Sequence, residues 1–173
     1  MKALRRRIER LFEWISAALL LALAVEVLVG IVFRATSRPL VWYDEVASVM
    51  LAWLTYYASA LAALKKAHIG FPGLVNALPR GGRIVALVVR EVAVIGFFVV
   101  LAVYGVHVMQ MLGGETLVTV DVPVRFTQSV IPVGAALFVL AELLNLPDQI
   151  AWAQGRAVVP GGALPDAAKE LSH

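Results

Sequence analysis

Four long apolar runs constrain the fold of this chain more than any other feature. They cover residues 15–33, 46–64, 92–112 and 126–141. The only charged residue inside them is Glu26. A helix needs about 20 mostly apolar residues to cross a bilayer, and an open strand edge would find no hydrogen-bond partner in lipid. We therefore predict an all-α membrane protein with four transmembrane helices, at about residues 14–36, 44–66, 83–112 and 126–147.

The composition excludes several other classes of protein. Apolar residues make up 61% of the chain and the mean hydropathy is +0.84, whereas ordinary soluble domains are roughly 45–50% apolar. The chain has no cysteine, which removes disulfides, thiolate nucleophiles and iron–sulfur clusters. The net charge of +3 does not indicate nucleic acid binding, because the basic residues flank the apolar runs as they do in membrane proteins.

The basic residues also predict the orientation. Eleven flank the runs on one side: Lys2, Arg5, Arg6, Arg7, Arg10, Lys65, Lys66, Arg80, Arg83, Arg156 and Lys169. Three flank them on the other: Arg34, Arg38 and Arg125. Basic residues are enriched in cytoplasmic loops, so both termini are expected in the cytoplasm and connections 34–44 and 113–125 outside. The first run exceeds the roughly 7–15 apolar residues of a signal peptide, so we expect a retained anchor.

Two further helices are predicted at the membrane surface. Apolar residues at helical spacing alternate with arginines before residue 15, which indicates an N-terminal amphipathic helix. A short interfacial helix is expected between the second and third spans, starting at Pro72 and ending at Pro79. Residues 1–147 then form the transmembrane domain and 148–173 a cytoplasmic tail. The predicted membrane-interface anchors are Arg5, Arg6, Arg7, Arg10, Trp42, Tyr43, Lys65 and Lys66.

The adjacent carboxylates Asp44 and Glu45 raise the question of catalysis. They open the second span, where Asp44 is expected to cap the helix and both carboxylates favour its positive end. A catalytic pair would need a nucleophile or a second polar cluster nearby, and the sequence shows neither. We predict no enzymatic activity, and a contact role for Glu45 stays open.

Glu26 is costly at mid-membrane, so a partner is expected for it. Thr55, Tyr56 and Tyr57 lie at similar depth, and contact with another subunit is the other interpretation. Nearer the inner leaflet, Arg90 is predicted to pair with Glu142 across the helices.

His68 and His107 suggest a haem held between helices. They lie at opposite ends of their spans, roughly 25–30 Å apart at 1.5 Å per residue, so one iron cannot use both. Structural roles are therefore favoured for these histidines.

Ordered motifs along the chain resemble a known family, the small membrane subunit (Q component) of tripartite ATP-independent periplasmic (TRAP) transporters. The first span ends in FRAT, and Trp42-Tyr43-Asp44-Glu45 opens the second, which ends in ALKKAHIGF. VDVPVRFTQSVIPVGAALFVL leads into the last span. The resemblance covers residues 5–147, and it departs from many relatives at TYYASA in the second span.

The resemblance implies a scaffold for a large elevator-type subunit and a docking site for a periplasmic substrate-binding protein, in sodium-coupled uptake of an organic acid. It implies a multi-pass protein of the bacterial inner membrane with no cofactor of its own, and with sodium on the large subunit. Candidate contacts with that subunit are Glu26, Trp53, Tyr56 and Tyr57. The candidate docking face comprises Asp44, Glu45, Glu115 and Asp121.

Two other functions stay open from the residues alone. One is a haem-bearing membrane anchor subunit. The other is a small transporter that works by itself as a homodimer, although the sequence shows no paired broken helices.

Overall fold

A computed structural model describes residues 2–66 and 78–154, with side chains from residue 5. Its helices are α1 (Lys2–Ala35), α2 (Tyr43–Leu64), α4 (Arg80–Met111), α5 (Val124–Gln128) and α6 (Val130–Ala153). Four helical stretches are long and apolar enough to cross a membrane, with α5 and α6 together supplying the fourth. The prediction of an all-α fold with four such helices is confirmed.

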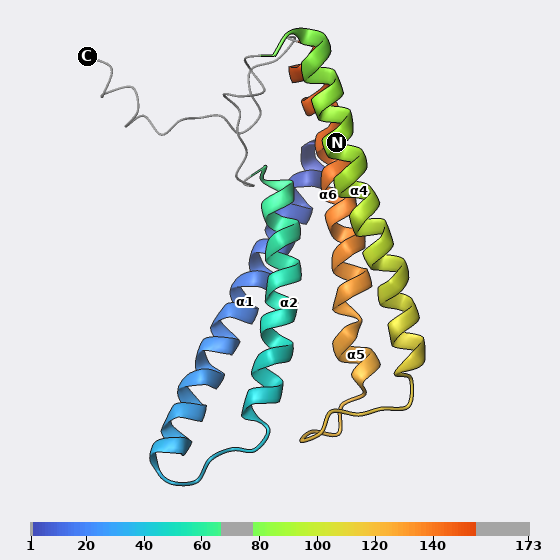
Figure 1. The fold of residues 1–173 in the computed structure, drawn as a ribbon. Helices are drawn as coiled ribbons and strands as arrows, with labels where there is room; N and C mark the ends of the chain where they lie inside the picture. The colour runs from blue at the N-terminus through green and yellow to red at the C-terminus, as the bar shows by residue number, and fades with distance from the viewer. Residues whose placement is uncertain (1, 67–77, 155–173) are drawn as a thin grey trace, which may run out of the picture.

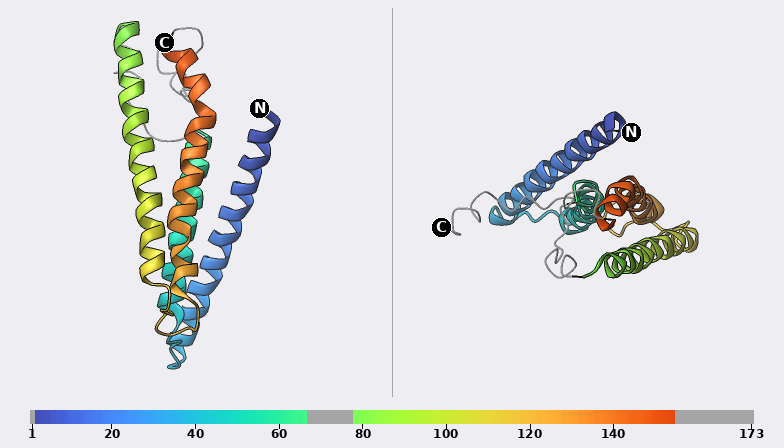
Figure 2. Two further views of the ribbon diagram at one scale, coloured as in Figure 1. Left: turned by 90° about the vertical axis from the view of Figure 1, so that its right-hand side faces the viewer. Right: turned by 90° about the horizontal axis from the view of Figure 1, so that it is seen from above.

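The four long helices form a row (Figures 1 and 2). α1 packs on α2, α2 packs on α6, and α6 packs on α4. Seen from above in Figure 2, α1 and α4 lie at opposite edges. The last helix in the chain thus occupies an inner place in the row.

The row has two distinct ends (Figure 1). We call the end that carries connections 36–42 and 112–123 the loop end. We call the opposite end, where α1 and α4 begin and α2 and α6 finish, the terminal end. These names describe the chain and imply no side of a membrane.

The amphipathic segment is continuous with the first span in α1. A separate N-terminal helix is therefore not confirmed. Part of its apolar face packs against this chain: Phe12 is buried and its ring lies 6.5 Å from that of Tyr57. The predicted interfacial helix lies mostly within 67–77, outside the described residues, as does His68.

Helix α6 extends beyond its predicted end at residue 147. It passes through Pro147 and finishes at Ala153, so residues assigned to the tail begin as helix. Proline lacks the N–H that a helix interior uses, but membrane helices tolerate it where neighbouring groups satisfy the freed backbone.

The buried apolar core lies where α2, α4 and α6 meet. It consists of Ala63, Leu64, Phe138 and Ala141, and the rings of Phe98 and Phe138 stack with centroids 3.9 Å apart. By contrast, most of α1 and α4 is exposed within this chain. Lipid or another subunit must cover these apolar faces, because water would not.

At three glycines, all in the half nearer the loop end, a neighbouring helix leaves little or no room for an added Cβ. A Cβ on Gly134 of α6 would lie 2.7 Å from the Tyr56 Cβ of α2. One on Gly105 of α4 would lie 3.0 Å from Ile131. One on Gly30 of α1 would collide with the ring of Tyr43. Small residues at such sites allow membrane helices to pack closely.

Candidate functional site

Polar side chains gather at the two ends of the row and form two clusters. The loop-end clasp consists of Glu45 with Val118 and Thr119. The terminal-end network comprises Arg5, Lys66, Arg90, Glu91, Glu142, Asn145, Asp148 and Gln149. Each cluster ties together segments that are far apart in the sequence.

The loop-end clasp joins the first turn of α2 to the connection after α4. Glu45 Oε1 accepts a hydrogen bond from the Val118 backbone N–H at 2.8 Å. Glu45 Oε2 accepts one from the Thr119 N–H at 2.7 Å and another from the Thr119 hydroxyl. A carboxylate that accepts several N–H and O–H bonds is held strongly, because charge-assisted hydrogen bonds are about twice as strong as neutral ones.

The connection that Glu45 holds has its own hydrogen-bonded structure. Leu117 N–H donates to Val122 C=O at 2.9 Å, and Val124 N–H donates to Glu115 C=O at 2.9 Å. Thr116 and Pro123 form an antiparallel bridge. This connection is therefore a small closed loop, and Val118 at its tip is 94% exposed.

The capping prediction for Asp44 is wrong. Helix α2 starts at Tyr43, its N-cap is Trp42, and no side chain caps it. Asp44 lies inside the first turn, where its backbone C=O accepts from the Ser48 hydroxyl. Its carboxylate therefore contributes only by its charge near the helix start.

The other members of the candidate docking face are close in sequence to the residues of the clasp. Asp44, Glu115 and Asp121 are exposed, and within the described ranges their carboxylates make no hydrogen bond or ion pair. Glu45 differs from them, because its carboxylate is already engaged inside this chain.

The candidate aromatic contacts are all used in packing within the chain. The Trp53 indole N–H donates to Thr127 C=O at 3.0 Å, and its ring lies 5.3 Å from that of Phe126. Tyr57 contacts Phe12 and Trp53, while Tyr56 lies against Gly134. Each side chain is half-buried, so a contact with another subunit would involve its remaining surface.

Glu26 finds no partner in the described part of the chain. Both carboxylate oxygens are buried without a hydrogen bond. Thr55, a suggested partner, donates to the Leu51 C=O instead. The oxygens are thus covered by this chain's own atoms, and reaching another subunit would require the side chain to move.

The predicted pair of Arg90 and Glu142 is confirmed. Arg90 Nη2 lies 3.1 Å from Glu142 Oε2 and 3.0 Å from Glu91 Oε1, although the latter contact lacks hydrogen-bond geometry. Gln149 Nε2 donates to the same Glu142 oxygen at 3.2 Å. One half-exposed guanidinium therefore serves two buried carboxylates.

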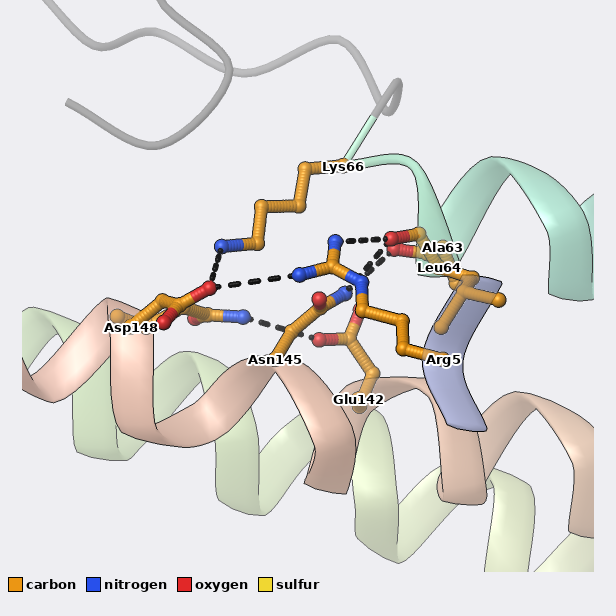
Figure 3. A network of polar contacts seen from close by, with 8 residues as sticks. Arg5, Ala63, Leu64, Lys66, Glu142, Asn145 and Asp148 are labelled. Carbon is orange, nitrogen blue, oxygen red and sulfur yellow. Dashed lines mark hydrogen bonds and ion pairs between the residues drawn. The ribbon is translucent and has the colours of Figure 1, made fainter. Parts of the chain in front are cut away.

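The rest of the network joins three helices at the terminal end (Figure 3). Asp148 Oδ2 lies 2.8 Å from Lys66 Nζ and 3.4 Å from Arg5 Nη1. Arg5 also donates to Leu64 C=O at 2.8 Å, and Asn145 Nδ2 donates to Ala63 C=O at 2.7 Å. Arg5 and Asn145 thereby bind carbonyls in the last turn of α2, where Ala63 C=O also accepts from the Lys66 backbone N–H.

Sequence reasoning missed Asn145, Gln149 and Asp148. Asn145 and Gln149 lie on the same face of the helix as Glu142, at the i+3 and i+7 positions. This spacing was the available signal. Asp148 falls in the segment 148–173 that was predicted to be the tail.

The predicted interface anchors lie in different environments. Arg6, Arg7, Arg10 and Trp42 are exposed. Lys65 pairs with Glu13 at 2.5 Å, and Tyr43 lies against Gly30.

Both clusters connect segments of this chain to one another. Within residues 2–66 and 78–154, no group of three or more His, Cys, Asp or Glu side chains is arranged to hold a metal. His107 is exposed on α4. The charged groups bind backbone and one another at the ends of the row.

A comparison with known protein families gives a match. A family model described as the DctQ component of tripartite ATP-independent periplasmic transporters matches residues 23–151. Individual curated proteins give no match. The matched range covers all of α2, α4, α5 and the loop-end clasp, together with most of α6. The chain therefore belongs to the DctQ family of TRAP transporter components, the small membrane subunits of these systems.

Proposed function

We propose that this chain is a non-catalytic scaffold, which braces the large elevator-type TRAP subunit and helps dock the periplasmic binding protein. The transporter would take up an organic acid with sodium, and the sodium sites would lie on the large subunit. The chain would sit in the bacterial inner membrane with both termini cytoplasmic, which places the loop end in the periplasm.

The open row of helices carries this proposal. Among the four long helices that the structure describes, α2 and α6 each pack on two other long helices, while α1 and α4 leave long apolar faces uncovered. A subunit that enclosed its own substrate path would instead need polar groups at mid-membrane. Here Glu26 is the only charged residue in the middle of a span. Uncovered apolar faces suit a brace that packs laterally on a larger membrane protein.

Reconstitution with defined components tests the proposal. A tagged chain should co-purify with a large multi-span protein that mass spectrometry identifies as a TRAP large subunit. Proteoliposomes with both subunits, the binding protein and a sodium gradient should accumulate an organic acid.

Omission controls separate the alternatives. Leaving out this chain should abolish uptake, and the chain by itself should give none. Uptake by this chain alone, or failure to associate with any large subunit, would overturn the proposal.

A further inference from the structure

The tip of the connection after α4 exposes a large apolar side chain. Val118 is 94% exposed, although valine is among the residues most often buried in proteins. Its exposure does not follow from a loose backbone. The Val118 N–H donates to Glu45. Backbone hydrogen bonds join the residues before the tip to those after it and so close the connection.

The clasp holds this tip in one place before any partner arrives. Glu45 binds the backbone of both tip residues and the hydroxyl of Thr119. Fixing a contact residue in advance lowers the entropy cost of binding, because less freedom is lost on association. None of these three bonds involves the Val118 side chain, which stays available.

The surroundings of the tip fit a soluble protein better than lipid. Exposed carboxylates precede and follow it at Glu115 and Asp121, and Asp44 lies next to the clasp. An apolar centre with a charged rim is the usual composition of a protein interface.

We propose that Val118 is an apolar contact for the periplasmic binding protein and that Glu45 is a positioning residue that holds it. This inference rests on the proposed function. It also changes the role of Glu45 from a docking charge to an internal support, while Asp44, Glu115 and Asp121 keep the charged role.

The affinity of the binding protein for the two-subunit complex in nanodiscs tests this inference. V118D should weaken docking about tenfold or more, as expected for a central interface residue. V118T, which has the same shape, should weaken it less. V41D is the matched control, because Val41 is 80% exposed in the other loop and should change affinity less than about twofold. Equal effects of V118D and V41D would overturn the inference.

Glu45 variants test positioning. E45A should weaken docking, and E45Q should restore part of the affinity because one acceptor oxygen remains. E45A/V118D should be no weaker than V118D, since both changes remove one contact. Uptake at saturating binding protein should stay near the wild-type rate, which a damaged helix row would not allow.

Thiol labelling gives a second readout, because the natural chain has no cysteine. V118C should react with a water-soluble maleimide, and added binding protein should block the reaction. Labelling that is slow without the binding protein would place the tip in the headgroups and overturn the inference. If wild-type complex docks the binding protein but V118D and E45A dock it equally well, only this inference fails. If wild-type complex does not assemble or dock, the proposed function fails.

Discussion

The two halves of the helix row are held together in different ways. Toward the loop end, glycines let helices approach closely, as Gly134 does with Tyr56 and Gly105 with Ile131. Toward the terminal end, side chains bind across helices, as Arg90 does with Glu142 and Asn145 with the Ala63 C=O. Lipid is as apolar as the helices, so the hydrophobic effect does not drive their association. Close packing and hydrogen bonds are the remaining attractive forces, and the tight glycine contacts lie in one half while the Arg90–Glu142 pair and the Asn145 bond lie in the other.

The largest loss of stability is expected when Arg90, in the terminal half of the row, is replaced. R90M leaves the carboxylates of Glu91 and Glu142 buried without a cation. Removing one partner of a buried pair costs about 3–5 kcal/mol, and we expect about 3 because Arg90 is half-exposed. Reversible unfolding in mixed micelles measures the loss. R90K keeps the charge and should lose less, whereas a wild-type unfolding curve for R90M would contradict the role given to this pair.

The loop half is tested by adding one methyl group. G134A places a Cβ against Tyr56 and should destabilise the protein by about 1–3 kcal/mol, because overpacking forces the helices apart. G96A is the control, since a Cβ there meets nothing within 4 Å. Alanine favours a helix by up to about 1 kcal/mol over glycine, so G96A should be neutral or stabilising. Equal destabilisation by both would show that close approach does not hold this half.

A smaller effect is expected at Asn145. N145L removes the hydrogen bond to the end of α2 and should cost about 0.6–1.7 kcal/mol, the range measured for such bonds between membrane helices. Q154L changes an exposed amide at the C-cap of the same helix and should have almost no effect. If N145L is as stable as Q154L, the Asn145 bond does not stabilise the protein. The polar stabilisation of the terminal half would then come mainly from Arg90. The same unfolding experiment decides this.

The smallest effect concerns pH and the pair of Lys65 and Glu13. The hydrogen bond to the Glu13 carboxylate raises the pKa of Lys65 above its usual value of 10.5. Stability from this pair is therefore fully present below pH 10.5 and is lost as the pH rises through the raised pKa. Unfolding measured from pH 9 to 12 should show this loss in wild type and not in E13Q. Because the pair is exposed to solvent, the difference should be small.

The long elements and one cross-helix contact were predictable from the sequence. Apolar runs place the four spans because lipid demands about 20 apolar residues in each. Arg90 and Glu142 lie at similar depth in their predicted spans, which allowed the pair to be predicted, and the structure shows it. Depth does not say which helices are neighbours, so the row order of α1, α2, α6 and α4 was not predictable.

The partner of Glu45 was beyond sequence reasoning for a different reason. Its bonds go to backbone N–H groups of a connection more than seventy residues away, and any residue type except proline supplies such a group. Residue identity at 118 therefore carried no signal, and at 119 only the Thr hydroxyl adds a bond that depends on residue type. Asp148 was missed because the last span was predicted to end at residue 147, whereas α6 continues past Pro147.

The order of the row has a consequence for how the protein is made. Helix α6 is the last of the described helices to leave the ribosome, yet it packs on both α2 and α4. Until it arrives, the α1–α2 hairpin and α4 lack the helix that joins them. Assembly of the row is therefore a late step in biogenesis, and both the Asn145 bond to α2 and the Glu142 bond to α4 can form only then. A nascent chain stalled before residue 130 would hold three long helices without α6, which packs on two of them.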